Sequence, residues 1–179
     1  MRKIAIDGGV LELVIGDITV QDTDAVVNAA NRRLAPGGGV AGAIHRAAGP
    51  GLWEECKQIG GIQTGEAVLT KGYDLLAEYV IHTVGPVYHG RSEDAVLLAS
   101  CYRSCLQLAD SKGLKSIAFP ALSTGIFGYP VDEAAEIALG TVVTALEDLL
   151  MVKLVRFVLF DESVLQIHIR QLDGIINKE

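Results

Sequence analysis

The sequence predicts an α/β fold with three layers, in which helices cover both faces of a mainly parallel sheet. One observation predicts this class, and a second predicts the number of domains. The second half of the chain alternates short apolar runs with segments of helical periodicity, an order typical of right-handed crossovers between parallel strands. The chain also has 179 residues, of which 50% are hydrophobic and 21% charged. This length and composition favour one compact domain, residues 1–179, over disorder or two linked domains.

The first half begins with antiparallel strands, because two strand-like runs are separated by Asp7-Gly8-Gly9, a sequence typical of a hairpin turn. Ala25 to Val27 is a short apolar run of the kind found in a strand buried on both faces. The last strand of this half is ended by Gly85-Pro86. The strands expected here are residues 1–6, 11–15, 25–27, 67–69 and 79–84, and helices are expected over residues 40–48 and 52–58.

The second half repeats a pattern of helix and strand. An apolar stripe at helical spacing, which includes Leu98, Cys101 and Cys105, predicts an amphipathic helix that Gly113 closes. The helices expected here are residues 95–112, 131–150 and 163–176, and the strands are residues 116–119 and 154–160. In an open sheet of this kind, ligands bind beyond the carboxyl ends of the parallel strands.

Charge and composition exclude several functions. The formal net charge is −7, whereas a sequence-independent nucleic-acid binder needs an excess of Lys and Arg on one face. No apolar run reaches the ~18 to 20 residues of a membrane span, and Asp7 follows too soon for a signal-peptide core. A cytoplasmic location without membrane contact is therefore expected. Cys56, Cys101 and Cys105 complete no metal site, so neither a metal nor a cofactor is expected.

The chain has 20 glycines among its 179 residues, about 11% against the usual ~7%. They concentrate in two loops. The first loop, Gly37 to Gly42, satisfies the letters of the dinucleotide-binding pattern G-x-G-x-x-G. It does not match the pattern's structural context, because nine residues, Asn28 to Pro36, separate it from the preceding strand. Its glycines still let backbone N–H groups approach an anion, and the helix that follows adds partial positive charge. A phosphate or ribose contact is favoured over a simple turn.

The second glycine loop, Ser123 to Gly128, lies between a buried strand and a helix that is expected to start at Pro130. Asp132 and Glu133 already complement the dipole of that helix, so a phosphate would lie on the amides of the loop itself. A plain connection rich in turn residues explains this sequence equally well. No Lys follows the glycines, so the loop is not a P-loop.

Two asparagines, Asn28 and Asn31, are expected just beyond the strand that ends near residue 27. An Asn side chain both donates and accepts hydrogen bonds, so the pair suits the hydroxyls of a ribose or an ordered water. Turn capping explains such a pair when it stands alone, whereas the adjacent glycine loop favours ligand binding. His45, on the helix after the glycine loop, is expected to be structural or solvent-facing rather than catalytic.

Five segments together resemble the macrodomain family, whose members bind ADP-ribose. They are G-D-I-T around Asp17, N-A-A-N ending at Asn31, G-G-G-V-A-G-A-I-H-R-A-A-G, H-T-V-G-P, and P-A-L-S-T-G-I-F-G-Y-P. They occur in the family's order between residues 15 and 161. The resemblance implies a mixed, six-stranded sheet between helices, with ADP-ribose lying across the strand ends.

The resemblance also implies a role for each loop. Asp17 would accept a hydrogen bond from the adenine amino group, and Phe160 would pack on the adenine. The 123–127 loop would wrap the diphosphate opposite the glycine loop, and Phe127 would cover the distal ribose. Asn31 would bind that ribose and orient a water near its anomeric carbon. The ligand-binding residues expected in total are Asp17, Ile18, Asn28, Asn31, Gly38, Gly39, Val40, Ser123, Thr124, Gly125, Ile126, Phe127 and Phe160.

Relatives with this glycine segment include hydrolases that remove ADP-ribose from acidic side chains or deacetylate O-acetyl-ADP-ribose. Many carry an Asp two residues after the third glycine, where this chain has Ala41. Whether His45 or Asp22 replaces that carboxylate is left open by the sequence. Correct positioning of the reactants can lower a reaction barrier by ~7 kcal/mol or more. We therefore favour a slow hydrolase over a non-catalytic reader. In this hydrolase, catalytic Asn31 and a diphosphate oxygen of the substrate place the water. The expected partners are ADP-ribose and either ADP-ribosylated proteins or O-acetyl-ADP-ribose.

Overall fold

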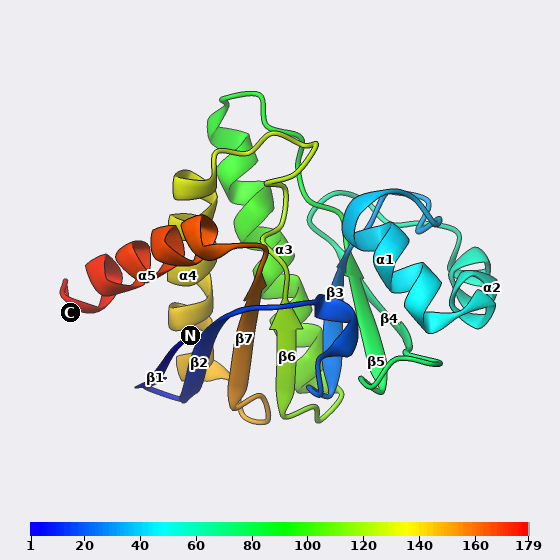
Figure 1. Ribbon diagram of the computed structural model, residues 1–179, viewed down its shortest axis with the longest axis horizontal. Coiled ribbons are helices and arrows are strands. Elements are labelled where there is room, and N and C mark those ends of the chain that lie inside the picture. Colours follow the sequence, from blue (N-terminus) through cyan, green and yellow to red (C-terminus); the bar gives the residue numbers. More distant parts are fainter. Residues whose placement is uncertain (179) are drawn as a thin grey trace.

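The protein is built around one central sheet, and its structure, a computed structural model, describes residues 1–178 (Figure 1). The strands are β1 Arg2–Ile6, β2 Gly9–Ile15, β3 Ala25–Ala29, β4 Ala67–Lys71, β5 Tyr79–Thr83, β6 Ser116–Phe119 and β7 Leu154–Leu159. Within the described residues, the seven strands lie in the order β1-β2-β7-β6-β3-β5-β4. The mixed, mainly parallel sheet is confirmed, with one strand more than the resemblance implies.

Helices cover both faces of the sheet. They are α1 Gly39–Ala48, α2 Pro50–Ile59, α3 Ser92–Ser111, α4 Val131–Asp148 and α5 Glu162–Ile176, together with a short 3₁₀ helix, η1 Ile18–Val20. Helices α1 and α2 pack on one face, and α3, α4 and α5 pack on the other (Figure 1). Successive residues of β6 alternate between the two cores, with Ile117 and Phe119 in the larger and Ala118 in the smaller. The three-layer prediction is confirmed.

The direction of the strands decides where the loops gather. Strands β1 and β4, at the two edges, are antiparallel to their neighbours, whereas β2, β7, β6, β3 and β5 are parallel. The predicted hairpin joins β1 to β2, with Ile6 opposite Gly9. Because five adjacent strands share one direction, their carboxyl ends meet at a single edge of the sheet. The loops that follow β5 and β6 stand at the top of Figure 1.

The larger core supports that edge through an aromatic cluster. The rings of Tyr102, Phe119 and Phe157 lie with centroids 5.0 to 5.8 Å apart, and buried aromatic rings dominate core energetics. The hydroxyl of Tyr102 accepts a hydrogen bond from the backbone N–H of Leu122 at 3.1 Å. The core therefore holds the start of the loop that follows β6.

One helix start and the place of one proline differ from expectation. Helix α3 begins at Ser92 instead of residue 95, because Asp94 in its first turn accepts hydrogen bonds from the N–H groups of His89 and Arg91 at 2.8 and 3.1 Å. This polar network is invisible to a search for apolar periodicity. Helix α4 begins at Val131, as the expected range has it, and Pro130 is its N-cap residue and not its first residue.

The three cysteines form no disulfide bond. Cys56, Cys101 and Cys105 are buried and free, and the last two share the buried side of α3. Among residues 1–178, no group of His, Cys, Asp and Glu is arranged to hold a metal ion. The same residues include no helix that is both long and apolar enough to cross a membrane.

Candidate functional site

Five loops leave the edge at which the parallel strands end. They follow β2, β3, β5, β6 and β7, and they comprise residues 16–24, 30–38, 84–91, 120–130 and 160–161. Every ligand-binding residue expected from the sequence lies in these loops or in the first turn of α1, apart from Asn28. Because β3 and β6 are neighbours, the glycine loop and the 123–127 loop leave adjacent strands. The structure thus brings the expected residues to one edge.

Asn31, in the loop after β3, is held in one orientation by its own loop. Its Nδ2 donates to the carbonyl oxygen of Ala35 at 2.8 Å, and its Oδ1 accepts from the N–H of Ala35 at 3.0 Å. Because Ala35 presents one donor and one acceptor, a flipped amide would lose both bonds. One N–H of Nδ2 and one lone pair of Oδ1 remain for other partners. Asn31 is therefore a preorganised, half-buried polar group at the site.

The glycine loop presents unpaired backbone amides. Helix α1 starts at Gly39, with φ +55°, and its N-cap residue Gly38 has no side chain to cap it. The N–H of Gly42 bonds the carbonyl oxygen of Gly38 at 3.1 Å, whereas those of Gly39, Val40 and Ala41 have no acceptor within residues 1–178. No acidic residue lies in this first turn. The positive end of the helix dipole is therefore free to attract an anion.

The loop after β6 presents a second row of unpaired amides. In the described chain, the N–H groups of residues 123–127 donate to no protein acceptor, whereas those of Gly128 and Tyr129 close the loop onto Gly125 and Ser123. Ser123 has φ +65°, in the left-handed region that costs a non-glycine residue about 1 kcal/mol or more. Its Oγ is buried without a partner. Strain and unpaired polar groups of this kind gather at ligand sites.

Two glycines in these loops are not required by the protein's own packing. A Cβ built on Gly38 or Gly125 meets no atom within 4 Å, and neither residue has a left-handed φ. By contrast, a Cβ on Gly42 would overlap a carbonyl oxygen of the glycine loop, and one on Gly85 would overlap Oγ of Ser123. The open space at Gly38 and Gly125 therefore suits the close approach of a ligand.

A cavity of about 370 Å³ opens beside Asn31. Its lining includes Asn31 and Phe127, residues of the loop after β5 and of the start of α3, and Arg32 and Arg91. The N–H of Tyr88 donates to the carbonyl oxygen of Phe127 at 2.9 Å, which joins the loop after β5 to the loop after β6. The volume lies within the ~300 to 1,000 Å³ of small-molecule sites.

The other end of the site lies where β2 and β7 end. Asp17 Oδ1 accepts hydrogen bonds from Oγ1 and N–H of Thr19 at 2.7 and 2.8 Å. Both bonds lower the pKa of Asp17, and the bond from the hydroxyl has the larger effect. Ile18 is buried beneath the same loop. Phe160 follows β7 directly and is 90% exposed. An aromatic ring exposed to solvent provides a surface on which a base can stack.

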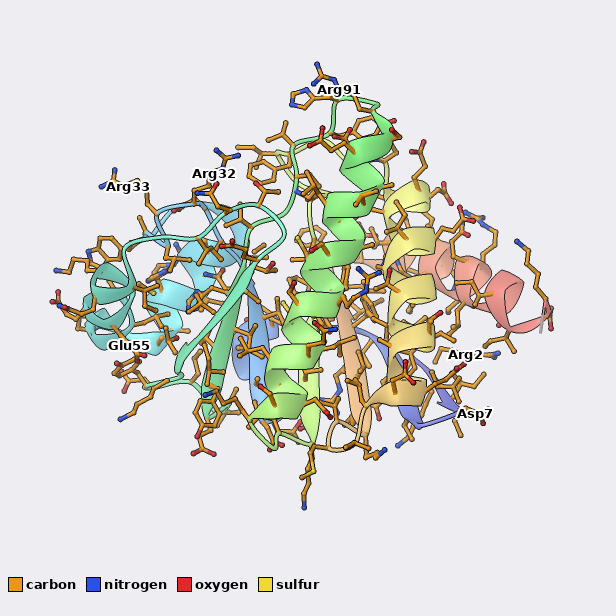
Figure 2. The ribbon with its side chains drawn as sticks, turned by 180° about the vertical axis from the view of Figure 1, so that it is seen from behind. Arg2, Asp7, Arg32, Arg33, Glu55 and Arg91 are labelled. Atoms are coloured by element: carbon orange, nitrogen blue, oxygen red, sulfur yellow. The ribbon has the colours of Figure 1, made fainter. Side chains whose placement is uncertain are left out.

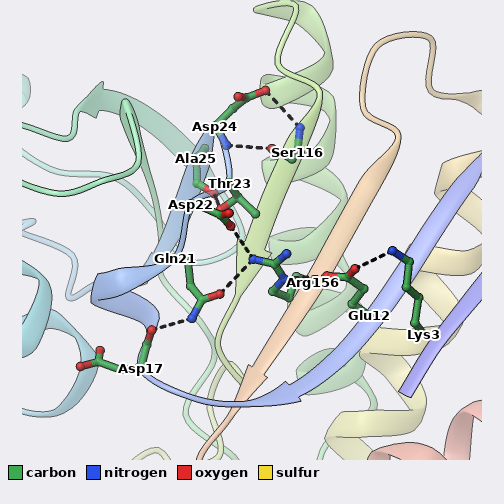
Figure 3. A network of polar contacts seen from close by, with 10 residues as sticks. All are labelled: Lys3, Glu12, Asp17, Gln21, Asp22, Thr23, Asp24, Ala25, Ser116 and Arg156. Carbon is green, nitrogen blue, oxygen red and sulfur yellow. Dashed lines mark hydrogen bonds and ion pairs between the residues drawn. The ribbon is translucent and has the colours of Figure 1, made fainter. Parts of the chain in front are cut away.

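Arg156, on β7, holds the loop that carries Asp17 (Figure 3). Its Nε donates to Glu12 Oε2 at 2.7 Å, and its Nη1 donates to Asp22 Oδ1 at 2.9 Å and Gln21 Oε1 at 3.1 Å. Nε2 of Gln21 in turn donates to the carbonyl oxygen of Asp17 at 2.8 Å. Sequence reasoning missed Arg156 and Gln21. The one signal was a charged residue inside the apolar strand L-V-R-F-V-L.

Asn28 lies inside β3 and not in the loop beyond it, where it was expected. Strand β3 continues through Ala29, because Asn28 and Ala29 pair with β5. The side chain of Asn28 is 0% exposed, and its Nδ2 lies 3.1 Å from Nδ1 of His82. Nε2 of His82 lies 2.9 Å from Oγ1 of Thr70, and burial lowers the pKa of His82 to about 3. Asn28 belongs to a buried, neutral network below the site.

The structure places His45 and Asp22, the two candidates to replace the carboxylate absent at Ala41, in different surroundings. His45 is 7% exposed and packs edge-on against Trp53 of α2, with ring centroids 6.5 Å apart. Asp22 is paired with Arg156. Ala41 is itself 5% exposed. The polar residues that line the cavity include Asn31, Arg32 and Arg91.

Comparison with known proteins identifies the family to which the chain is related. The sequence profile of the Macro domain matches residues 27–138. A macro domain-containing protein of Mesorhizobium japonicum is 54% identical over 156 residues, which cover 87% of this chain and 89% of the relative. A protein of Klebsiella pneumoniae named O-acetyl-ADP-ribose deacetylase is 51% identical over 166 residues, which cover 90% of this chain and 95% of the relative.

Solved structures agree with this result. The macrodomain of Oceanobacillus iheyensis with ADP superposes with a TM-score of 0.95 at 44% identity, covering 99% of this chain and 97% of that one. The Trypanosoma brucei macrodomain in complex with ADP-ribose gives a TM-score of 0.85 at 47% identity, covering 89% of this chain and 68% of that one. Since the profile spans most of the chain and the relatives span nearly all of it, this protein belongs to the macrodomain family.

Proposed function

We propose that this protein binds ADP-ribose across the sheet edge and hydrolyses ester-linked ADP-ribose, either on proteins or as O-acetyl-ADP-ribose. The observation that carries the proposal is the two rows of unpaired amides, residues 39–41 and 123–127, on the loops of adjacent strands. Such amides bind a diphosphate without cationic side chains, which suits a chain of net charge −7. The Klebsiella relative's name and the ligands in the two solved structures support it.

The diphosphate position decides where the other parts of ADP-ribose lie. Its oxygens occupy the open space over Gly38 and Gly125, between the two rows of amides. The adenine then extends to the ends of β2 and β7, where Asp17 accepts its amino group and Phe160 stacks on its ring. The distal ribose extends the other way, to Asn31. The loop residues Gly39, Val40, Ser123, Thr124, Ile126 and Phe127 line this path, and Ile18 supports the adenine from below.

In the proposed reaction, Asn31 positions a water at the distal ribose. The water oxygen forms a bond to the anomeric carbon while the bond from that carbon to the acceptor's carboxylate oxygen breaks. The carboxylate leaves with the electron pair, and a diphosphate oxygen of the substrate takes the water's proton. With O-acetyl-ADP-ribose, the water oxygen adds instead to the acetyl carbonyl carbon, and the bond from that carbon to the ribose oxygen breaks. The ribose oxygen leaves with the electron pair and takes a proton, so that acetate and ADP-ribose are released. The free N–H and lone pair of Asn31 fix ribose and water in reacting geometry.

Ala41 favours a second candidate, a reader that binds ADP-ribose without catalysis. It is the third residue of α1 and offers no group that could take a proton. A side chain that acts as general base contributes roughly 10²- to 10⁴-fold to a rate. The hydrolase is therefore expected to be slow, and the reader to show no turnover.

Two measurements separate these candidates. ADP-ribose is titrated by calorimetry, and the protein is incubated for hours with O-acetyl-ADP-ribose and with a protein ADP-ribosylated on glutamate, while released acetate and ADP-ribose are quantified by chromatography. Binding with release supports the hydrolase. Binding without release from either substrate assigns the reader, and absence of binding overturns both.

A further inference from the structure

The cavity beside Asn31 has room beyond the distal ribose. Under the proposed function, on which this inference rests, Asn31 and Phe127 hold that ribose, and both residues line the cavity. A group esterified to the ribose therefore adjoins a space of about 370 Å³ that continues to the loop after β5 and the start of α3. An acetyl group would leave most of this space to water, whereas a polypeptide segment would fill it.

Two arginines line this cavity, and the protein does not neutralise them. Arg32 reaches the hydroxyl of Thr64 at 3.4 Å, and within residues 1–178 neither Arg32 nor Arg91 forms an ion pair. By contrast, Arg170 pairs with a carboxylate although its side chain is 67% exposed. Figure 2 shows Arg32, Arg33 and Arg91 projecting from the same end of the molecule. An anionic ligand therefore finds unpaired guanidinium groups here.

The carboxylates near the cavity do not cancel this charge. Asp94 is 4% exposed, and its Oδ2 accepts hydrogen bonds from the N–H groups of His89 and Arg91. These bonds lower the pKa of Asp94, and the bond from His89 has the larger effect. Glu93 is exposed, but it lies in the first turn of α3, where the positive end of the helix dipole offsets part of its charge. An incoming ligand thus meets two arginines and one exposed carboxylate.

The two arginines form a local positive charge on a protein whose net charge is negative. At net charge −7, the surface repels acidic polypeptides, and an arginine can bind a carboxylate through two parallel hydrogen bonds. We propose that the cavity binds the polypeptide side of an ADP-ribosylated substrate, and that Arg32 and Arg91 select substrates in which acidic residues flank the modified side chain.

The test compares three substrates. Two peptides are ADP-ribosylated on a single glutamate, one flanked by Asp and Glu and the other by Ser and Gly, and the third substrate is O-acetyl-ADP-ribose. The wild type is compared with the double variant Arg32→Gln/Arg91→Gln and with Arg103→Gln, a control that removes an exposed arginine in the groove between α3 and α4. The value of kcat/KM is measured for each substrate, and ADP-ribose is titrated separately.

The wild type is expected to prefer the acid-flanked peptide by about tenfold, and higher salt reduces this preference. The double variant loses the preference but keeps ADP-ribose affinity and O-acetyl-ADP-ribose turnover within twofold, and Arg103→Gln changes nothing. Equal losses on all three substrates, or no preference in the wild type, overturn the inference and leave the proposed function intact. The inference is also overturned if an RNA oligonucleotide competes with the acid-flanked substrate more strongly than an unmodified acidic peptide does.

If the protein proves to be a reader, the peptides remain intact and the same comparison is made with their Kd values. Tighter binding of the acid-flanked peptide, lost in the double variant, then supports the inference, and equal Kd values overturn it. Failure to bind ADP-ribose at all overturns the proposed function and the inference together.

Discussion

The two ends of the proposed cleft are built in different ways. At the diphosphate and distal-ribose end, the binding groups are backbone amides and one side chain, Asn31, which Ala35 locks from both sides. At the adenine end, the groups are the side chains of Asp17 and Phe160, which extend into solvent. The difference indicates that the first end is preorganised by the chain itself, whereas at the second end Thr19 holds the Asp17 carboxylate and the exposed Phe160 ring adapts to its ligand.

This difference has an energetic consequence. Groups that are already fixed lose little entropy on binding, and they act on the developing charge of a reaction without reorganising. Exposed side chains gain contacts on binding but must first be ordered. The catalytic effect is therefore expected to depend on the preorganised end, and the adenine end is expected to contribute affinity alone.

The largest effect is expected for Asn31→Ala. The variant keeps both rows of amides but loses the group that orients ribose and water, so kcat for O-acetyl-ADP-ribose is expected to fall by about 100-fold or more, whereas the Kd for ADP-ribose rises by less than tenfold. Chromatographic turnover assays and calorimetry measure the two quantities. Asn31→Asp serves as a control, because it keeps an acceptor for the Ala35 N–H but loses the donor. Equal losses in kcat and affinity would show that Asn31 only binds.

A substantial effect on affinity is expected for Gly125→Ala and Gly38→Ala. The new Cβ has open space in the protein and an ordinary φ, so the free energy of unfolding should change by less than about 0.5 kcal/mol. The methyl group would occupy the ligand's place, and ADP-ribose affinity is expected to fall at least tenfold. Urea denaturation and calorimetry measure the two effects.

Gly140→Ala is the matched control for these variants. Gly140 lies inside α4 and also has open space, so alanine should stabilise the protein by up to about 1 kcal/mol through helix propensity. Its ADP-ribose affinity should stay unchanged. Unaltered affinity in Gly125→Ala and Gly38→Ala would show that the open space over the loops is not the diphosphate site.

The two ends also differ in how well the sequence predicts them. The buried parallel strands are predictable, because burial on both faces produces continuous apolar runs such as Ile117 to Phe119. The diphosphate loops are predictable in outline, since glycine marks places where backbone approaches a ligand. The unpaired state of the 123–127 amides is not predictable, because it depends on where the loop turns.

Two features escaped prediction because they depend on tertiary pairing. Asn28 looks like a loop residue, but its pairing with β5 extends β3 and turns its side chain into the core. Arg156 has no motif around it, yet it links the sheet to the Asp17 loop through Gln21. Both cases show that polar residues next to a strand acquire their role from the neighbouring strands and loops.

A smaller effect is expected when the adenine end loses its support. Gln21→Glu keeps a side chain of the same length beside Arg156 but removes the donor to the Asp17 carbonyl oxygen. We expect about fivefold weaker binding of ADP-ribose, in line with the loss of one hydrogen bond of ~1 kcal/mol. Ribose 5-phosphate, which lacks the adenine, should bind to the variant and to the wild type with the same affinity. Equal weakening for both ligands would mean that Gln21 supports the whole cleft and not the adenine end.

The smallest effect is expected for Thr19→Val, and it appears in the pH dependence. The Thr19 hydroxyl is the first cause of the lowered pKa of Asp17. A lowered pKa means that the carboxylate, the form that accepts a hydrogen bond from adenine, persists until the pH falls through that lowered value. Removal of the hydroxyl raises the pKa towards the usual 3.8, so the loss of ADP-ribose affinity on acidification should begin at a higher pH.

Calorimetric titrations from pH 7 downwards measure this shift, with Thr19→Ser as the control that keeps the hydroxyl. At pH 7 the variant should bind within about twofold of the wild type, because Asp17 is ionised in both. Asn31→Ala, measured over the same range, should show the wild-type pH profile with a uniform offset, since no titrating group is lost. Superimposable profiles for Thr19→Val and the wild type would mean that the Asp17 carboxylate takes no part in adenine binding, and the adaptable end would then rest on Phe160 alone.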